Sequence, residues 1–233
     1  GGGFAWMREH LVTGYSPAWY SPFPDGSADA AFVNSGESRW YNYYVEGLGW
    51  MVKNLGIDGL YLDDVSYDRH ILQRMRRIME RERPGCMIDL HSNTGFSIGP
   101  ANQYLEFMPY VDRTWFGESF DYNGMGPDQW LVQVSGIPFG VMGEMLANGG
   151  NQWRGVLYGM TSRLRWKTGD VVCDPTNVWN IWDAFGIADS EFIGWFDPDA
   201  PVKTGNAKVK ASVFKKPGKA LIAVGNWDKD ATV

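Results

Sequence analysis

The hydrophobic positions between residues 37 and 55 recur with the spacing of an α-helix. They lie three or four residues apart, which places them on one side of a helix. This predicted apolar side consists of Trp40, Tyr44, Leu48, Met51 and Leu55. Asn34, followed three residues later by Glu37, has the spacing of an N-terminal capping pair, and Gly56 stands where a helix typically ends. We therefore predict a helix over 37–55.

A short apolar run and a second helical pattern follow this helix. Residues 57–64 begin as an apolar run and end in two acids, which predicts a buried strand with polar residues at its end. A helix is then expected over 67–83, because Pro84 and Gly85 would end it. Its apolar positions are Ile71, Met75, Ile78 and Met79. Residues 87–91 predict the next strand.

The second helix also carries a run of basic residues. These are Arg74, Arg76, Arg77, Arg81 and Arg83. Such a run is compatible with phosphate binding, but Glu80 and Glu82 interleave with the arginines. We therefore interpret the run as the solvated side of an amphipathic helix.

The alternation of strands and helices continues along the chain. Further helices are predicted near 101–108, 126–134, 151–164 and 176–186. Further strands are predicted near 110–116, 137–142 and 171–173. This alternation predicts parallel strands joined by helical crossovers, and the number of units favours a (β/α)8, or TIM, barrel of the α/β class over an open doubly wound sheet. No glycine-rich phosphate loop follows a strand, which argues against a nucleotide-binding oxidoreductase.

The pattern changes after about residue 200. Residues 208–214 alternate between apolar and polar side chains, 215–219 have the composition of a turn, and 220–224 form a second strand pattern. This is the signature of a β-hairpin. We therefore assign 1–200 to a catalytic barrel and 201–233 to the first hairpin of a C-terminal antiparallel β-sandwich.

The predicted barrel is incomplete at its N-terminal side. Five barrel strands are predicted, whereas a closed barrel of this kind needs eight. The first 36 residues have the pattern of a loop with one short helix near 6–11. We expect the chain to be a fragment that lacks about three upstream strands and most of the C-terminal sandwich.

The composition is that of a folded globular protein, with 44% hydrophobic and 21% charged residues. No apolar run approaches the roughly 18 residues of a membrane helix, so no membrane partner is expected. The net charge of −6 argues against nucleic acid as a partner. Cys86 and Cys173 are expected to be free buried thiols, with one disulfide in an exported, periplasmic or extracellular, protein as the alternative. The sequence does not indicate an oligomeric state.

Polar residues recur where the predicted strands end. The ends of successive strands carry Asp63 and Asp64, then His91, Ser92 and Asn93, then Glu118, then Glu144, and then Asp174. The active sites of TIM barrels lie where strands end and βα loops begin, so these side chains are expected to converge. Each has a structural alternative, such as a helix cap for Asp64 or an ion pair between Glu118 and Arg113. Asp58 and Asp89 lie at the start and inside of strands and are interpreted as structural.

Two of these acids are suited to different protonation states. Asp63 shares the strand parity of Gly59 and Tyr61, so it reaches the barrel mouth if that face points inward. Glu118 follows Trp115 and Phe116, and apolar surroundings would keep its carboxyl protonated. An ionised carboxylate beside a protonated one is what the cleavage of a glycosidic bond requires.

Aromatic residues make up 15% of the chain, and the chain also contains 29 glycines, which favour flexible loops. Aromatic rings serve either as platforms for sugar rings or as core, and composition leaves both open. The candidate sugar platforms are Trp19, Tyr20, Trp115, Phe116 and Trp153. His91 and Asn93 are candidates for binding substrate hydroxyls, as is Glu144 for binding substrate.

The segment Asp58-Gly59-Leu60-Tyr61-Leu62-Asp63 resembles the fourth strand of many barrel glycoside hydrolases, in which such a run ends in the catalytic nucleophile. The wider pattern is similar to the bacterial glycoside hydrolase family 123-like group. Supporting segments are Arg8–Leu11, Pro17–Trp19, Gly117–Ser119, Trp182–Ile187 and Pro201–Thr204.

This resemblance implies a retaining hydrolase with Asp63 on the fourth strand and Glu118 on the sixth as acid/base. It also implies an oligo- or polysaccharide substrate. Family 123 is associated with an adjacent Asp-Glu pair and with assistance by the N-acetyl group of the substrate, whereas this chain has Asp63-Asp64. In the assisted version, Asp63 would orient the acetamido group and Asp64 would be the acid. In the direct version, Asp63 attacks and Glu118 protonates.

Two other readings of the barrel stay open. A non-catalytic carbohydrate-binding relative would lack two carboxyls facing one cleft at the separations of a glycosidase. A metal-dependent hydrolase would need clustered ligands, but the three histidines, His10, His70 and His91, have no ligand-type spacing. We therefore expect neither a metal nor a cofactor.

Overall fold

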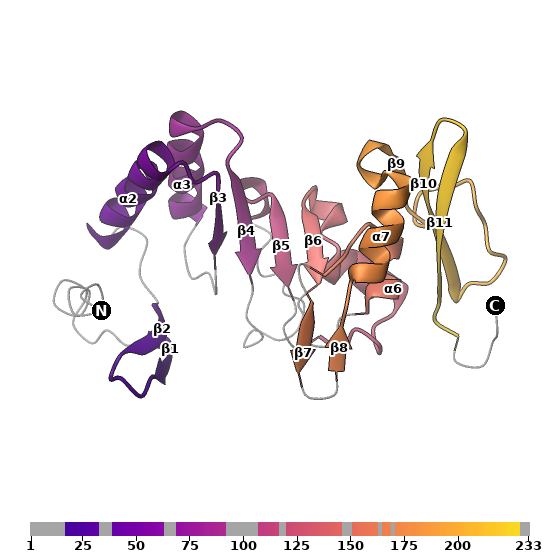
Figure 1. Ribbon diagram of the computed structural model, residues 1–233, viewed down its shortest axis with the longest axis horizontal. Coiled ribbons are helices and arrows are strands. Elements are labelled where there is room, and N and C mark those ends of the chain that lie inside the picture. The colour runs from indigo at the N-terminus through magenta and orange to yellow at the C-terminus, as the bar shows by residue number, and fades with distance from the viewer. Residues whose placement is uncertain are drawn as a thin grey trace. The chain divides into compact units, whose positions relative to one another are not determined.

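The computed structural model describes residues 17–32, 39–62, 69–91, 107–116, 120–145, 151–162, 165–168 and 171–228. The chain divides into two compact units, and each is described by itself. The first unit contains residues 1–91 with 109–112, and the second contains 92–108 with 113–233. Figure 1 labels their helices and strands.

The first unit begins with an antiparallel hairpin of β1 (Pro17–Pro22) and β2 (Ala28–Phe32). The turn between them is held by Asp25, whose carboxylate accepts hydrogen bonds from the backbone N–H and the hydroxyl of Ser27. These bonds lower the pKa of Asp25. The expectation that this stretch is loop-like was wrong, because a local turn of this kind joins two short strands without any long apolar run.

The predicted helix over 37–55 is confirmed as α2 (Arg39–Leu55), but its buried side is a different one. The buried side chains are Tyr41, Val45, Leu48 and Val52. Leu55 is 61% exposed, so the predicted stripe lies one residue out of phase. Both stripes have helical spacing, and the contact of α2 with α3 (Arg69–Glu82) selects between them.

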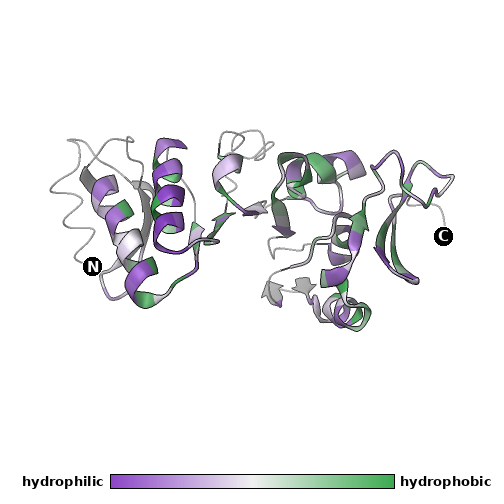
Figure 2. Ribbon diagram, turned by 90° about the horizontal axis from the view of Figure 1, so that it is seen from above, coloured by the Kyte–Doolittle hydropathy of each residue, from purple (hydrophilic) through white to green (hydrophobic). Residues whose placement is uncertain are grey.

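The second predicted helix and the strands around it are confirmed. Helix α3 buries Ile71, Leu72, Met75, Ile78 and Met79, and Figure 2 shows both helices of this unit with hydrophilic and hydrophobic turns. Gly49 of α2 allows a close approach here, since a Cβ at that position would lie 3.1 Å from Ile78 Cγ1. Strands β3 (Gly59–Leu62) and β4 (Met87–His91) pair in parallel, as a crossover helix requires.

The second unit contains another parallel pair, formed by β5 (Arg113–Phe116) and β6 (Met142–Met145). Between them lie α5 (Pro127–Gln129), a π-helical turn η2 (Trp130–Val134) and a 3-10 turn η3 (Ile137–Phe139). The strand predicted over 137–142 was wrong at its start. Gly136 and Gly140 have positive φ angles of 71° and 73°, and they enclose a 3-10 turn before β6 begins.

The next segments also differ from the prediction. Helix α6 (Gln152–Gly155) continues only as the 3-10 turn η4 (Val156–Tyr158), which ends at Gly159 with a φ of +68°. The strand predicted near 171–173 exists as β8 (Val171–Cys173). It pairs antiparallel with β7 (Trp166–Thr168), so it is one arm of a hairpin and not a parallel barrel strand.

The C-terminal part consists of α7 (Thr176–Phe185) and an antiparallel sheet. A short 3-10 turn η5 (Ile187–Asp189) follows α7. The sheet has the order β11 (Lys219–Asn226), β10 (Val209–Lys216), β9 (Glu191–Ile193). The predicted hairpin is confirmed as β10 and β11, whereas β9 was not foreseen.

One aromatic core connects these elements of the second unit. Trp130 has no exposed surface and stacks on Tyr158, with ring centroids 5.7 Å apart. The Tyr158 hydroxyl donates to Pro127 O at 2.7 Å, and burial raises the pKa of Tyr158. Trp195 packs edge-on against Tyr158 from the C-terminal part. These three rings therefore belong to the hydrophobic core. Composition alone had left open whether aromatic rings are core or sugar platforms.

The sheet of the C-terminal part is fixed to η4 by a buried serine. The hydroxyl of Ser212 on β10 donates to Leu157 O at 2.6 Å and accepts from Trp195 N at 2.9 Å. Gly225 of β11 allows close approach, because a Cβ there would lie 2.2 Å from Leu157 Cδ1. Among the described residues, no helix is long and apolar enough to cross a membrane.

Candidate active site

The face of the β3–β4 pair that bears Tyr61 is the first candidate region. Ile88 and Leu90 on β4 are fully buried on one face. Because side chains alternate along a strand, Tyr61 on β3 belongs to the other face, where it is 42% exposed. Tyr61 stacks on His91, with ring centroids 5.9 Å apart and planes inclined by 19°. His91 is thereby fixed beside an accessible aromatic ring.

This face also carries an acid that sequence reasoning had set aside. Asp89 is the parallel register partner of Tyr61, and only 3% of it is exposed. It shares its strand parity with His91, two residues further along β4. The sequence could have indicated both residues. Tyr61 lies two positions before Asp63, and Asp89 lies two positions before His91, and residues two positions apart on a strand share one face.

The predicted acids and amides that follow these strands fall outside the described residues. They are Asp63, Asp64, Asn93 and Glu118. In the sequence, Asp63 comes directly after Leu62, the last residue of β3, and Glu118 comes two residues after Phe116, the last residue of β5. Their assignment as site residues stays a prediction.

The β5–β6 pair carries the second candidate region. Arg113 Nη1 lies 2.8 Å from Glu144 Oε1, and Glu144 is only 5% exposed. The guanidinium compensates the buried carboxylate, which would otherwise be costly to bury. Trp115 is the register partner of Glu144. The other face of β6 packs against η2, since a Cβ on Gly143 would lie 2.4 Å from Val134 O.

One expectation is corrected at this pair. Glu144 was expected after a strand, but it lies inside β6. Arg113 pairs with Glu144 in the structure, and the alternative pairing with Glu118 falls outside the described residues. Trp115 is 8% exposed, which favours a packing role over an open sugar platform. Trp19 and Tyr20 lie on β1. Their side chains fall outside what the structure describes, so their role as sugar platforms stays a prediction.

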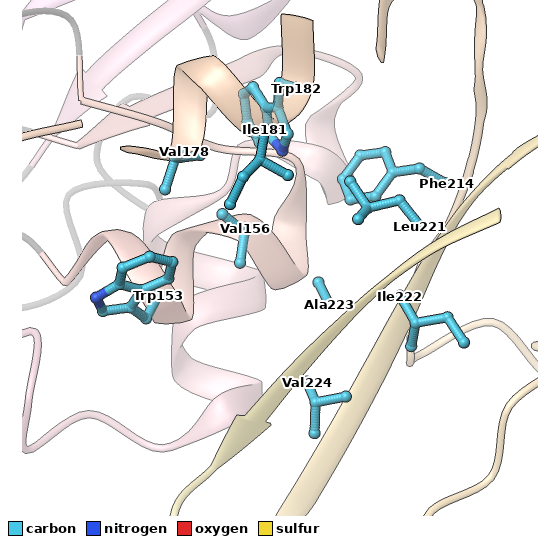
Figure 3. Close-up of a pocket in the computed structure, with 10 residues that line it drawn as sticks. All are labelled: Trp153, Val156, Val178, Ile181, Trp182, Phe214, Leu221, Ile222, Ala223 and Val224. Carbon is cyan, nitrogen blue, oxygen red and sulfur yellow. The ribbon is translucent and has the colours of Figure 1, made fainter. Parts of the chain in front are cut away.

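Trp153 lies in the wall of an apolar groove, drawn in Figure 3. The groove is formed by α6, η4, α7 and the β10–β11 hairpin, with Trp153 54% exposed at one side and Trp182 at another. Its lining is Trp153, Val156, Val178, Ile181, Trp182, Phe214, Leu221, Ile222, Ala223 and Val224. Oriented binding of a sugar needs polar groups beside the aromatic face, and this lining is apolar throughout.

Asp174 has a structural role at the start of α7. Its carboxylate accepts hydrogen bonds from the backbone N–H and the hydroxyl of Thr176, and it pairs with Arg165 at 2.8 Å. The bonds to Thr176 lower the pKa of Asp174. The acid that was placed among the strand-end candidates therefore holds the turn that leads into α7.

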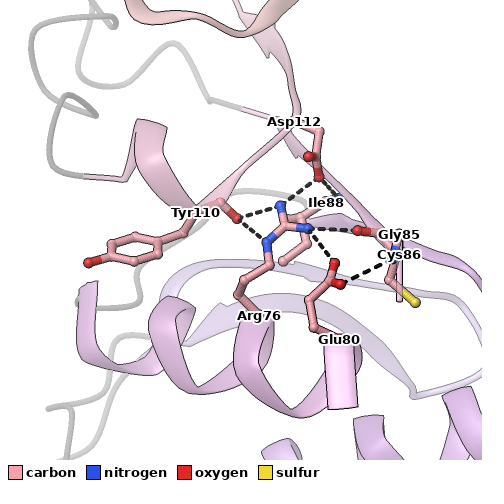
Figure 4. A network of polar contacts seen from close by, with 7 residues as sticks. All are labelled: Arg76, Glu80, Gly85, Cys86, Ile88, Tyr110 and Asp112. Atoms are coloured by element: carbon pink, nitrogen blue, oxygen red, sulfur yellow. Dashed lines mark hydrogen bonds and ion pairs between the residues drawn. The ribbon is translucent and has the colours of Figure 1, made fainter. Parts of the chain in front are cut away.

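Arg76 is the centre of a polar network at the amino end of β4, shown in Figure 4. Its guanidinium donates to Cys86 O at 2.6 Å, to Tyr110 O at 2.9 Å and to Asp112 Oδ2 at 2.6 Å. The same Asp112 oxygen accepts from Ile88 N. Sequence analysis had placed Arg76 on the solvated side of α3, which was wrong for this one arginine because main-chain acceptors surround its head group.

Cys86 lies in this junction and is 2% exposed, so the prediction of a free buried thiol is confirmed for it. Burial raises the pKa of the Cys86 thiol, with the charge of Glu80 acting in the same direction. In the part of the chain that the structure describes, no group of three His, Cys, Asp or Glu side chains has the arrangement of a metal site.

Comparison with known protein families decides the class of the molecule. Residues 1–165 match the model of the glycoside hydrolase 123 TIM-barrel domain, and residues 174–233 match that of the glycoside hydrolase 123 C-terminal domain. The chain belongs to glycoside hydrolase family 123. A search of curated proteins finds no match.

The family 123 chain is therefore a glycosidase built from a TIM-barrel domain and a C-terminal domain, and its substrate is a carbohydrate. Both parallel strand pairs, β3–β4 and β5–β6, belong to the barrel match. The C-terminal match contains α7 and the sheet of β9, β10 and β11. The family favours the hydrolase over the non-catalytic alternative that the sequence had left open.

Proposed function

We propose that this family 123 enzyme cleaves a glycosidic bond of an oligo- or polysaccharide with two carboxyl groups and net retention at the anomeric carbon. The observation that carries the proposal is the end of β3. Asp63 is the next residue after this strand, and the face to which its parity assigns it bears the accessible Tyr61 ring stacked on His91. Residues after the carboxyl ends of barrel strands form the active sites of TIM-barrel enzymes.

In the proposed reaction Asp63 is the nucleophile and Glu118 is the acid/base. The Asp63 carboxylate attacks the anomeric carbon while the bond from that carbon to the leaving oxygen breaks, and Glu118 gives its proton to that oxygen. The ionised Glu118 then takes a proton from water. The resulting oxygen attacks the anomeric carbon, which releases the sugar and restores the Asp63 carboxylate.

Residues around the two acids would bind the sugar. His91 and Asn93 are suited to hydroxyl groups, and Tyr61 offers a ring face beside His91. Trp19 and Tyr20 remain predicted platforms, whereas the burial of Trp115 and the apolar groove around Trp153 argue against that role for these two. Glu144 would act through the guanidinium that it holds, since Arg113 keeps 31% of its side chain exposed.

A second version of the mechanism rests on the doublet Asp63-Asp64. Here the acetamido oxygen of an N-acetylhexosamine attacks its own anomeric carbon, Asp63 orients that group, and Asp64 protonates the leaving oxygen. The two versions differ in which residue is the acid and in whether the substrate needs an N-acetyl group.

The test is a panel of aryl α- and β-glycosides, with and without 2-acetamido groups, on the wild type and the variants Asp63→Asn, Asp64→Asn and Glu118→Gln. The direct mechanism predicts losses of about 10²–10⁴ in kcat/KM for Glu118→Gln, the range of general acid catalysis, and retention of most activity in Asp64→Asn. The assisted mechanism predicts the reverse and activity on acetamido substrates alone. Equal activity in all four proteins would reject both versions.

A further inference from the structure

The segment that follows Glu118 is held by two side chains from distant parts of the chain. Residues 122–125 form a turn whose backbone carbonyls point at Arg154 and Trp227. Arg154 Nη1 donates to Asn123 O at 2.6 Å, to Tyr122 O at 3.0 Å and to Met125 O at 3.5 Å. Trp227 Nε1 donates to Met125 O at 2.9 Å.

The two side chains also contact each other. The Arg154 guanidinium lies 4.8 Å from the centre of the Trp227 ring, which is the geometry of a cation–π contact. Burial lowers the pKa of Arg154, while the charge of Asp121 acts in the opposite direction. We call this pair the Arg154–Trp227 clamp.

Both ends of the clamp are themselves fixed. Asn151 caps α6 by accepting from Arg154 N at 3.0 Å, and its amide also donates to Asn123 Oδ1 at 2.8 Å. Trp227 N donates to Lys208 O at 2.8 Å, directly after the β10–β11 hairpin. The turn is therefore contacted by α6, which belongs to the part of the chain matched by the TIM-barrel domain, and by the residue after β11, which belongs to the part matched by the C-terminal domain.

The turn itself leaves little freedom on its inner side. Tyr122 is 1% exposed, its ring packs against Trp130 at 5.4 Å, and Trp130 Nε1 donates to Tyr122 O at 3.1 Å. Met125 is 6% exposed in the same core. Three side chains thus donate to the carbonyls of a four-residue turn that begins four residues after Glu118.

We propose that the Arg154–Trp227 clamp fixes the turn that begins four residues after Glu118 and so positions this acid for proton transfer, which would give the C-terminal domain a part in catalysis. The inference rests on the proposed function of Glu118. Arg154 and Trp227 are positioning residues, because they act through the 122–125 turn and not on the substrate. A displacement of about 1 Å in a positioned catalytic group can cost on the order of 10²-fold in rate.

Dependence on the leaving group separates this role from a purely structural one. Aryl glycosides with a strongly acidic phenol leave without help from an acid, whereas those with a weakly acidic phenol need the proton of Glu118. We expect Trp227→Phe and Arg154→Lys to reduce kcat/KM by on the order of 10-fold for the weakly acidic phenols. The loss for the strongly acidic ones should stay within about 3-fold.

The controls are Glu118→Gln and Trp50→Phe. Trp50 lies on α2 and is 58% exposed, so its exchange tests the loss of an indole as such. If Glu118→Gln shows no leaving-group dependence, the proposed function of Glu118 fails. If Glu118→Gln shows it but both clamp variants lose activity equally for all phenols, or lose none, the clamp inference fails. Failure of both clamp variants to fold would also overturn it, because the contacts would then be a requirement of folding.

Discussion

Two arginines hold main-chain carbonyls in the two units, and they differ in what surrounds them. Arg76 donates to Cys86 O and Tyr110 O and pairs with Asp112 at 2.6 Å, directly before β4 begins. Arg154 donates to carbonyls of a turn that follows β5 and lies over an aromatic ring. In TIM barrels the amino ends of strands serve stability and the carboxyl ends serve catalysis. The comparison shows that the same contact, an arginine that donates to main-chain carbonyls, can occur at the amino end of a strand, where it stabilises the fold, or after its carboxyl end, where the active site is expected.

The largest effect should come from removing the head group on the stability side. Arg76→Ala removes the guanidinium from two carbonyls and from the Asp112 carboxylate, which then keeps only its bond from Ile88 N among the described residues. We therefore expect a loss of about 2–4 kcal/mol in the free energy of unfolding, measured by urea titration. The leaving-group dependence of the folded enzyme should not change. Arg77→Ala, at an exposed position of the same helix, is the matched control. A change in leaving-group dependence for Arg76→Ala would remove the distinction between the two arginines.

A smaller effect is expected where the C-terminal sheet is fixed to η4. Ser212→Ala removes a buried hydroxyl and leaves Leu157 O and Trp195 N without their partner. We expect a loss of about 1–2 kcal/mol in the free energy of unfolding, which is the cost of leaving buried polar groups unsatisfied. Because Ser212 does not touch the 122–125 turn, relative activity across phenols should stay constant. A selective loss for weakly acidic phenols would show that the whole sheet, and not the clamp, positions Glu118.

The smallest effect concerns Asp174, which is on the surface. Its pKa in the folded state is lowered below the ordinary 3.8, so its contribution to stability is present above that pH and is lost as the pH falls through the folded-state pKa. We expect the difference in melting temperature between the wild type and Asp174→Asn to be constant from neutral pH down to about 4 and to shrink below it. Asp183→Asn, an exposed acid on the same helix, is the control. A difference that persists unchanged below the folded-state pKa would contradict this role.

Periodicity located most elements, and its errors have physical causes. The two candidate stripes of α2 share Leu48 and have equivalent spacing, so only the position of α3 could show that Tyr41 and not Leu55 is buried. The start of β6 was misplaced because Gly136 before the apolar run 137–142 and Gly140 within it both have positive φ. The pairing of β8 was misread because an isolated apolar triplet does not reveal strand direction.

For the site, the sequence located groups that follow strand ends but not the contacts that hold them. The predictions for Asp63 and Glu118 depended on strand ends, which β3 and β5 now define. The Arg113–Glu144 pair could not be assigned, since its two residues are 31 positions apart in the sequence and other acids are nearer to Arg113. Contacts such as that between Trp227 and Met125, 102 residues apart, depend on the path of the whole chain and leave no local pattern.

The burial of Cys86 at the junction of α3 and β4 has a consequence for measuring the N-terminal unit alone. A thiol reagent reaches this sulfur only when the junction opens, because just 2% of the residue is exposed. In a Cys173→Ser background, the rate at which Cys86 is labelled therefore reports how often the structure around Arg76 opens. Local opening of the first unit can then be measured separately, without any signal from the aromatic core of the second unit.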